Sequence, residues 1–416
     1  MTLPIIGVIF GNKYHANYIE WKGRRSMALK RDNPASYQGF EQGPIRPPSE
    51  AFSLLIRATR NCPWNHCRFC SVYKDAKFSI RPVDDVKRDI DEVCRHVTNI
   101  LKFTDSSGRI SQADIRKAAE HVQPWDFDAF SAAYNWVASG MKSVFLQDAN
   151  SLILKPAHLV EILNHLKMRF PFIERVTSYA RSHTVAGIND EDLAAIRGAG
   201  LNRIHIGLES GSDEVLRLMK KGVSKQDHVK AGQKAKKAGM ELSEYVMPGL
   251  GGKALSEVHA RETADALNRI NPDFIRLRSL TVGNGIPVYE DVQAGRFEKA
   301  TDLLMIQEIY LFIQGLHGIR SRIVSDHMMN LLQEVEGNLP EDQGKMLGIL
   351  QGYLDMDPEK QCLYQVGRRL GFFSSVSDMD DPGLLSRAVQ RRDKLGITPG
   401  NVDQVLGDVL ARFVRL

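Results

Sequence analysis

The sequence has little cysteine and no long apolar run, and each shortage argues against a class of protein. Five cysteines in 416 residues are too few, and odd in number, for the disulfide framework of a small secreted protein. No run of about 18 uncharged apolar residues is present, which argues against a membrane span. The N-terminus has neither the basic start nor the small-residue cleavage site of a secretion signal. We therefore expect a cytoplasmic protein without a membrane segment.

An excess of charge of one sign is also missing. Lys and Arg together number 55 and Asp and Glu 50, so the formal net charge is +5, which is too small to predict nucleic-acid binding by itself. Apolar residues make up 43% of the chain and charged residues 25%, values typical of a globular protein. At about 100–200 residues per domain, the length predicts two or three domains or one large barrel with additions.

From residue 52 onward the sequence shows short apolar segments that alternate with helical patterns. Alternation of this kind predicts an α/β fold with a parallel sheet and right-handed crossovers, either an open doubly wound sheet or a partial barrel. The six expected strands are Phe52–Ala58, Ser143–Gln147, Arg175–Tyr179, Arg203–Leu208, Glu241–Val246 and Phe274–Leu280.

Capping residues predict where the helices between these strands begin. Pro156 suits a first helical turn because its missing N–H would have had no partner there. Ser212 and Ser224 can accept backbone N–H groups as N-caps. Ser256 is expected to cap the helix that runs toward Ile270.

These patterns divide the chain into three parts. Residues 1–50 are expected to form an N-terminal arm that packs on the main body. Residues 51–290 hold the strand–helix units, with a helical insertion near 98–134, because the interval between the first two strands is too long for one crossover. The strand pattern stops after Tyr289, so residues 291–416 are expected to form a helical C-terminal extension.

Three of the five cysteines follow the first expected strand within nine residues. Cys62, Cys67 and Cys70 can ligate three irons of a [4Fe–4S] cluster and leave the fourth iron open for a ligand. The alternative is zinc, with His66 or a distant residue as fourth ligand, although structural zinc sites usually come as two separated ligand pairs. Unliganded core cysteines are a third interpretation, which the polar loop disfavours.

This loop resembles the cluster-binding loop of the radical S-adenosylmethionine (SAM) superfamily, in which three cysteines follow the first strand of a partial (β/α)6 barrel. The family spacing is most often C-x3-C-x2-C, whereas this chain has C-x4-C-x2-C, with the aromatic Phe69 before the last cysteine as the family commonly shows. The resemblance implies a TIM-barrel-like partial (β/α)6 fold and two cofactors, the [4Fe–4S] cluster and S-adenosyl-L-methionine.

The segment IHIGLESGS, from Ile204 to Ser212, resembles the branch that contains the tRNA methylthiotransferases, the elongator-type enzymes and the oxygen-independent coproporphyrinogen oxidases. In that branch the acidic residue at the end of the strand holds the ribose of SAM, which implies this role for Glu209, with Ser210 beside it. A carboxylate can accept from both vicinal hydroxyls. The plain alternative is a helix-starting turn with Glu209 in solvent.

By the same resemblance, the ends of the second and third strands meet the methionine part of SAM. Gln147 and Asp148 stand where the family usually has GGE and holds the amino group. Ser178 or Arg181 would meet the carboxylate. A surface Arg that caps a loop is an equal alternative for Arg181.

The last two strands complete the set of candidates. Val246, Met247 and Pro248 occupy the place where the family holds the adenine. Arg276 and Arg278 lie on the last strand, where one face is the barrel interior, so one of them is expected to point at substrate. The alternative is an Arg that reaches solvent. All these strand ends meet at one edge of a barrel, where barrel enzymes assemble their sites.

The resemblance implies reductive cleavage of SAM to a 5′-deoxyadenosyl radical that takes a hydrogen atom from substrate, with an electron donor such as flavodoxin or ferredoxin. We expect a small-molecule substrate and assign no catalytic residue. Asp326 and His327 are candidate acid–base groups near the substrate, and the favoured alternative is a capping Asp and a surface His. The composition shows neither the RNA-binding tail of tRNA-modifying members nor a cobalamin domain, so nucleic acid is not expected as a partner. The alternatives are a radical SAM enzyme that modifies RNA and a non-catalytic Fe–S or zinc-binding protein.

Overall fold

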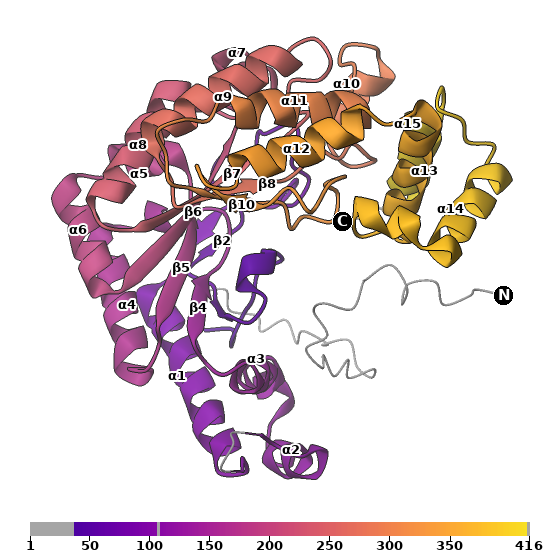
Figure 1. The fold of residues 1–416 in the computed structure, drawn as a ribbon. Helices are drawn as coiled ribbons and strands as arrows, with labels where there is room; N and C mark the ends of the chain where they lie inside the picture. The colour runs from indigo at the N-terminus through magenta and orange to yellow at the C-terminus, as the bar shows by residue number, and fades with distance from the viewer. Residues whose placement is uncertain (1–36, 106–108, 414–416) are drawn as a thin grey trace.

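A curved sheet of eight strands organises the molecule, in a computed structural model that describes residues 37–105 and 109–413 (Figure 1). The strand order is β1-β4-β5-β6-β7-β8-β9-β10, and every pair except β9–β10 is parallel. The strands are β1 (Leu54–Ile56), β4 (Ser143–Leu146), β5 (Arg175–Ala180), β6 (Leu201–Glu209), β7 (Glu241–Val246), β8 (Phe274–Leu277), β9 (Arg322–Val324) and β10 (Gly337–Asn338). A separate antiparallel pair is β2 (Thr59–Arg60) and β3 (Ser79–Ile80).

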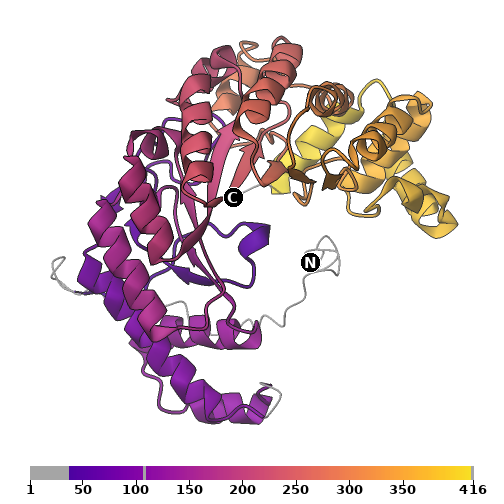
Figure 2. The same ribbon diagram turned by 60° about the vertical axis from the view of Figure 1, so that its left-hand side comes forward.

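All six expected strands are present, and their parallel pairing confirms the predicted fold class. The helices that connect them line the convex side of the sheet, as Figures 1 and 2 show. This is the layering of a partial (β/α) barrel. The helices are α1 (Val83–Leu101), α4 (Pro156–Arg169), α5 (Ser182–Gly187), α6 (Asp190–Ala199), α7 (Asp213–Leu218), α8 (Lys225–Lys237) and α9 (Ser256–Ile270).

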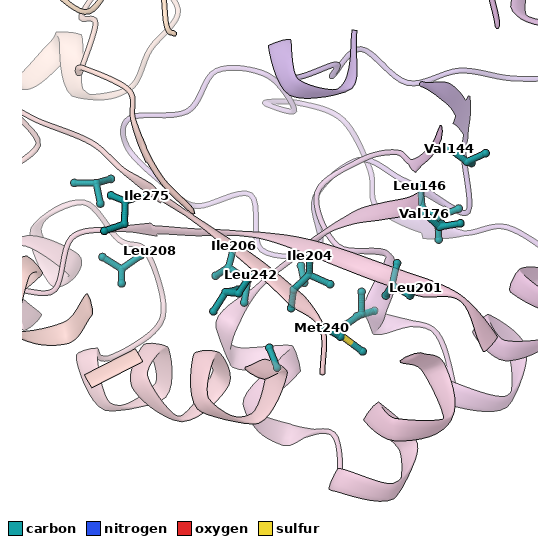
Figure 3. Close-up of a cluster of buried hydrophobic side chains, with 14 of the residues drawn as sticks. Val144, Leu146, Val176, Leu201, Ile204, Ile206, Leu208, Met240, Leu242 and Ile275 are labelled. Carbon is teal, nitrogen blue, oxygen red and sulfur yellow. The ribbon is translucent and has the colours of Figure 1, made fainter. Parts of the chain in front are cut away.

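The main core lies between the sheet and these helices (Figure 3). Successive strand residues point to opposite faces, so Ile204, Ile206 and Leu208 of β6 all face the helices and are fully buried. The other face of the sheet is aromatic. Tyr179 packs edge-on against Phe145, with ring centroids 5.4 Å apart, and also lies 5.4 Å from the ring of His205.

The capping residues confirm three of the four expected helix starts. Pro156 is the first residue of α4. Ser212 and Ser224 cap α7 and α8, and Ser224 forms a full capping box with Asp227. The prediction for Ser256 is wrong: Leu255 is the N-cap and Ser256 is already helical. The hydroxyl of Ser256 instead donates to the buried Glu308, at 2.6 Å, a tertiary contact that the local pattern does not reveal.

Helices also form the insertion and most of the C-terminal part. The insertion contains α2 (Gln112–Ala119) and α3 (Phe127–Ala138), while the C-terminal part contains α10 (Val288–Gln293), α11 (Asp302–Gln314), α12 (Gln343–Leu354), α13 (Pro358–Arg369), α14 (Pro382–Lys394) and α15 (Val402–Phe413). Short 3-10 turns are η1 (Pro48–Glu50), η2 (Pro124–Asp126), η3 (Ser151–Ile153) and η4 (Val376–Asp380). Within the described residues, no helix combines the length and apolar character needed to cross a bilayer.

The expectation of an entirely helical segment after residue 290 is wrong in one respect. β9 pairs in parallel with β8, and β10 returns antiparallel to β9, so the sheet continues beyond the six expected strands. Both strands are too short, at three and two residues, to show the periodicity from which a strand is predicted.

The described part of the N-terminal arm, residues 37–50, packs along the sheet. Gly43 donates its N–H to the side chain of Gln147 at 2.7 Å, and Gln147 donates to the carbonyls of Gly43 and Ile45. Glu50 is fully buried and lies 3.4 Å from the ring of His205. The apolar stretch at residues 4–10 lies outside the described residues.

Candidate functional site

The cysteine loop begins where β1 and the β2–β3 pair meet. Thr59 of β2 pairs with Ile80 of β3, so the two strands hold together the ends of the loop that carries Cys62, Cys67 and Cys70. Asn61 and Asn65 adopt positive φ angles of 66° and 49°, conformations that Asn tolerates better than most residues. The loop therefore has a defined backbone conformation, and the β2–β3 pair holds its two ends together.

Asp148 holds the start of this loop. Its carboxylate, fully buried after β4, accepts from Arg57 Nε at 2.7 Å, from the Asn61 backbone N–H at 2.9 Å and from the Tyr73 hydroxyl at 2.9 Å. Hydrogen bonds to a buried charged group are among the strongest in proteins. Asp148 thus binds the backbone of Asn61, the residue that precedes Cys62.

The middle of the loop is anchored to the top of the barrel by its backbone. The N–H of Arg68 donates to the carbonyl of Met219 at 2.9 Å, and the carbonyl of Arg68 accepts from Val288 N–H at 2.8 Å. Trp64 donates its indole N–H to the carbonyl of Lys220 at 2.7 Å. The middle of the loop is therefore fixed by two separate parts of the chain, residues 219–220 and Val288.

Burial and nearby cations have opposite effects on the pKa values of the thiols. Burial raises the pKa of Cys67, and the positive charges of Lys221 and Arg181 partly oppose that rise. Burial also raises the pKa of Cys70. Asn65 donates its backbone N–H to Cys62 Sγ at 3.4 Å. Such N–H groups and cations stabilise thiolates once a metal ligates them.

The donor set of the loop bears on the choice between zinc and a larger cluster. A structural zinc usually takes four protein ligands in two separated pairs. The loop instead carries three thiols within nine residues. Three thiolates on one loop fit a [4Fe–4S] cluster with one open iron.

Glu209 ends β6 with a positive φ angle of 64°, which turns its side chain out of the regular alternation. Its Oε1 lies 3.2 Å from Lys221 Nζ, and the two side chains are 12% and 13% exposed. Lys221 also lies 5.5 Å from the ring centre of Phe69 in the cysteine loop. The structure therefore brings Glu209 and the cysteine loop together through Lys221.

Arg181 belongs to the same group of residues. Its guanidinium donates to the carbonyl of Lys221 at 2.9 Å and stacks over Trp64, 5.1 Å from the ring centre. Its charge acts on Cys62 and Cys67. The side chain thus faces the cysteine loop and not open solvent.

Three other predicted residues make contacts within the protein. Gln147 is occupied by residues 43–45, as described above. Ser178 is buried, lies on the face of β5 opposite Tyr179 and donates to the carbonyl of Tyr179 at 3.0 Å. Ser210 is buried and lies 2.8 Å from His259 Nδ1. These hydrogen bonds hold the ends of β4, β5 and β6 in place.

The segment of Val246, Met247 and Pro248 continues the sheet beyond β7. Val246 and Pro248 accept backbone N–H groups from Arg278 and Leu280 at 2.9 and 2.8 Å. Met247 donates its N–H to the carbonyl of Glu209 at 3.0 Å. This backbone is engaged in the protein, and the Met247 side chain remains partly exposed.

The two arginines of the last predicted strand differ in burial and in whether they have an ion-pair partner. Arg276 is buried and paired with Asp326 at 3.2 Å. Arg278 is half-buried. Its guanidinium has no hydrogen-bond or ion-pair partner among the described residues. His327 lies within range of its charge, and burial together with Arg278 lowers the pKa of His327 to about 3. A half-buried cation without a counter-ion is suited to an anionic ligand.

Sequence reasoning missed Lys221, Arg57 and Tyr73. Lys221 looks like an ordinary basic residue at a helix end, and nothing local indicates that it folds back onto Glu209. Arg57 and Tyr73 lie on either side of the cysteines along the chain, but their convergence on Asp148 depends on the pairing of β1 with β4.

Comparison with known proteins agrees with the predicted family. The Radical SAM superfamily model matches residues 128–263, a region that includes β4 to β7 and Glu209. Two curated relatives are tRNA uridine(34) acetyltransferases, from Methanocaldococcus infernus, 27% identical over 256 residues, and from Methanocaldococcus jannaschii, 21% identical over 272 residues. Each match covers 60% of this chain and 46% of the relative, so the chain spans about half the length of these proteins.

Solved structures give a weaker likeness. Coproporphyrinogen III oxidase (HemN) from Escherichia coli, described as a radical SAM enzyme, aligns with a TM-score of 0.40 and 15% identity, over 63% of this chain and 52% of that one. The superfamily uses a [4Fe–4S] cluster and SAM, the two cofactors that the sequence predicts. The family model therefore identifies residues 128–263 of this chain as a radical SAM domain.

Proposed function

We propose that this protein is a radical SAM enzyme that modifies RNA, with tRNA as the first substrate to test. The observation that carries the substrate class is the similarity to two tRNA uridine(34) acetyltransferases, each over 60% of the chain. This substrate class takes the place of the small molecule expected from the sequence. The proposal concerns the substrate class and the generation of the radical, because the chain spans only 46% of each relative.

In this proposal Cys62, Cys67 and Cys70 ligate the [4Fe–4S] cluster. The N–H donor at Cys62 and the cations near Cys67 support the assignment. When bound, the cluster supplies the electron that cleaves SAM to methionine and a 5′-deoxyadenosyl radical. Asp148 acts as a positioning residue, since its carboxylate fixes the start of the loop.

The remaining residues bind and orient SAM. Glu209 accepts hydrogen bonds from the ribose hydroxyls, and Lys221 holds the carboxylate in place through the 3.2 Å ion pair. Arg181 takes the methionine carboxylate, because it is the guanidinium that faces the cysteine loop. Met247 contacts the adenine through its partly exposed side chain. Arg278, whose charge has no counter-ion in the described residues, meets an anionic group of the substrate.

The first experiment tests the radical chemistry. The protein is reconstituted anaerobically with iron and sulfide, then supplied with dithionite and SAM, and 5′-deoxyadenosine is measured by chromatography. Production by the wild type but not by Cys67→Ala supports the proposal. A colourless protein that binds one zinc would refute it, and an iron–sulfur protein that never forms 5′-deoxyadenosine would point to a non-catalytic role.

The second experiment tests the substrate class. Affinity for total tRNA is measured as salt is raised from low to physiological concentration. Binding to RNA phosphates weakens with salt, with a slope set by the number of phosphates contacted, so a steep linear fall of log affinity is expected. If the affinity for tRNA does not depend on salt, or if tRNA does not bind, a small-molecule substrate becomes the better proposal.

A further inference from the structure

A surface pocket of about 430 Å³ opens beside the cysteine loop. One wall is the loop itself, through Trp64 and His66, and the other is the end of α7 with the connection to α8. The lining residues are Trp64, His66, Leu216, Arg217, Lys220, Gly222 and Val223. None of them has a role in the proposed binding of SAM or substrate.

The pocket combines apolar walls with a basic rim. Trp64 and Val223 provide the apolar surface, whereas Arg217 and Lys220 are exposed at its edge. For the side chains of Arg217 and Lys220, the described part of the chain supplies no ion-pair partner. A basic rim with unpaired cations complements an acidic partner and speeds its encounter.

One wall of the pocket belongs to the same peptide segment as the cluster ligands. Trp64 lies between Cys62 and Cys67 in the loop, and His66 is the direct neighbour of Cys67. The two rings contact each other edge to face, with centroids 5.0 Å apart. A partner seated here would thus lie against the loop that carries the cluster.

Trp64 is poorly placed to stack on a nucleobase. Arg181 covers its ring at 5.1 Å. Gly222 packs against the ring so closely that any added Cβ would collide with it. Recognition of single-stranded RNA relies on aromatic faces that are open to bases, and Arg181 occupies one face of this ring. The pocket therefore favours a protein partner over RNA.

We propose that this pocket is the docking site of the electron donor, an acidic redox protein of the flavodoxin or ferredoxin type. The inference rests on the proposed function, because only a cluster that must be reduced needs such a partner. One electron passes from the prosthetic group of the donor to the cluster. The donor is oxidised and the cluster reduced by one electron, with no bond broken and no proton transferred.

The test compares two sources of electrons in the full-length reconstituted protein. Formation of 5′-deoxyadenosine is measured with dithionite, and separately with flavodoxin, flavodoxin reductase and NADPH. The variant is Arg217→Glu with Lys220→Glu, and the matched control is Lys230→Glu, an exposed lysine of α8 that does not line the pocket. Binding of flavodoxin to each reconstituted protein is measured in parallel by biolayer interferometry.

The double variant is expected to lose about tenfold or more of the flavodoxin-supported rate at low salt, through a higher KM for flavodoxin. Its dithionite-supported rate stays within about twofold of wild type, and its affinity for flavodoxin falls in parallel. An equal loss with both reductants, or an unchanged flavodoxin-supported rate, would overturn the proposal. So would a variant that loses affinity for tRNA but not for flavodoxin.

Failure of the proposed function gives a different pattern. In that case the wild type forms no 5′-deoxyadenosine with dithionite. If flavodoxin binding still depends on Arg217 and Lys220, the docking site is supported without the proposed function. If flavodoxin binds equally well to the double variant, the docking site is overturned.

Discussion

Lys221 Nζ lies 3.2 Å from Glu209 Oε1, in a pair of side chains that are each nearly buried. The same ammonium lies over the Phe69 ring, and its charge acts on Cys67 and Cys70. Lys221 is therefore the link between the strand end proposed to hold the ribose and the loop proposed to hold the cluster. A change at this one residue is expected to affect both.

This link predicts strong coupling between the two residues in SAM binding. Glu209→Gln and Lys221→Met are each expected to raise the dissociation constant for SAM about tenfold, or about 1.4 kcal/mol. The double variant should bind only slightly more weakly than either single variant, because the two side chains act as a pair. Calorimetry on the reconstituted proteins measures all four constants, with Lys220→Met as a neighbouring control. Fully additive losses would contradict the coupling.

Loss of the Asp148 carboxylate is expected to weaken the cluster without removing a ligand. Asp148→Asn loses the ion pair with Arg57 and weakens the bond to the Asn61 N–H. Residues that orient metal ligands typically contribute about 10–100-fold to metal affinity. Iron per chain after reconstitution, and its rate of loss to a chelator, measure the effect. Asp75→Asn, an exposed change in the same loop, serves as control, and equal iron retention in both variants would count against the role of Asp148.

The five cysteines are expected to divide into two classes. Cys67→Ala should abolish the visible absorbance of the reconstituted protein. Cys94→Ala and Cys362→Ala should keep it, since both residues lie away from the loop. Cys362 is 1% exposed and packs in a small core with Val366 and Ile397, so its replacement should lower the free energy of unfolding by about 1 kcal/mol. Loss of the absorbance in the Cys94 or Cys362 variant would show that a fourth cysteine contributes.

Glu244 predicts a pH dependence of stability. Burial raises its pKa well above the ordinary value, and neither carboxylate oxygen has a hydrogen-bond partner in the described residues. The folded state thus keeps a proton that the unfolded chain releases above about pH 4.3. Stability is fully present below that pH and falls as the pH rises toward the folded-state pKa.

Replacement of Glu244 by Gln removes this proton linkage. The free energy of unfolding of the variant, relative to wild type, is expected to increase between pH 5 and pH 8, by up to about 1.4 kcal/mol per pH unit. Urea titrations at each pH measure it, with Glu241→Gln at the start of the same strand as control. A constant difference between wild type and Glu244→Gln would mean that the carboxyl is already ionised in the folded protein.

The sheet could be predicted from sequence because each strand carries its own signal. Apolar residues such as Ile204 and Ile206 recur at the period of a strand, and Pro156 and Ser224 mark helix starts locally. β9 and β10 carry no such signal, because two or three residues cannot show a period. Ser256 was misplaced since its hydroxyl is used by Glu308, a residue on α11.

The candidate site was predictable to the level of its motifs. Cys62 and Glu209 stand in recognisable segments, and the structure brings both segments to Lys221. The partners of these residues were not predictable, because they come from distant parts of the chain. Asp148 resembles a ligand-binding residue in the sequence, yet its oxygens are occupied by Arg57, Asn61 and Tyr73.

The contacts of residues 37–50 bear on how the chain is made. Gly43 is paired with Gln147, 104 residues later, and Ser49 lies 3.4 Å from His205, 156 residues later. This segment leaves the ribosome well before either partner is synthesised. Its polar groups must remain in water until β4 and β6 have emerged, and such distant pairings slow folding. The first described residues of the chain thus cannot make these contacts until the chain has been synthesised as far as His205.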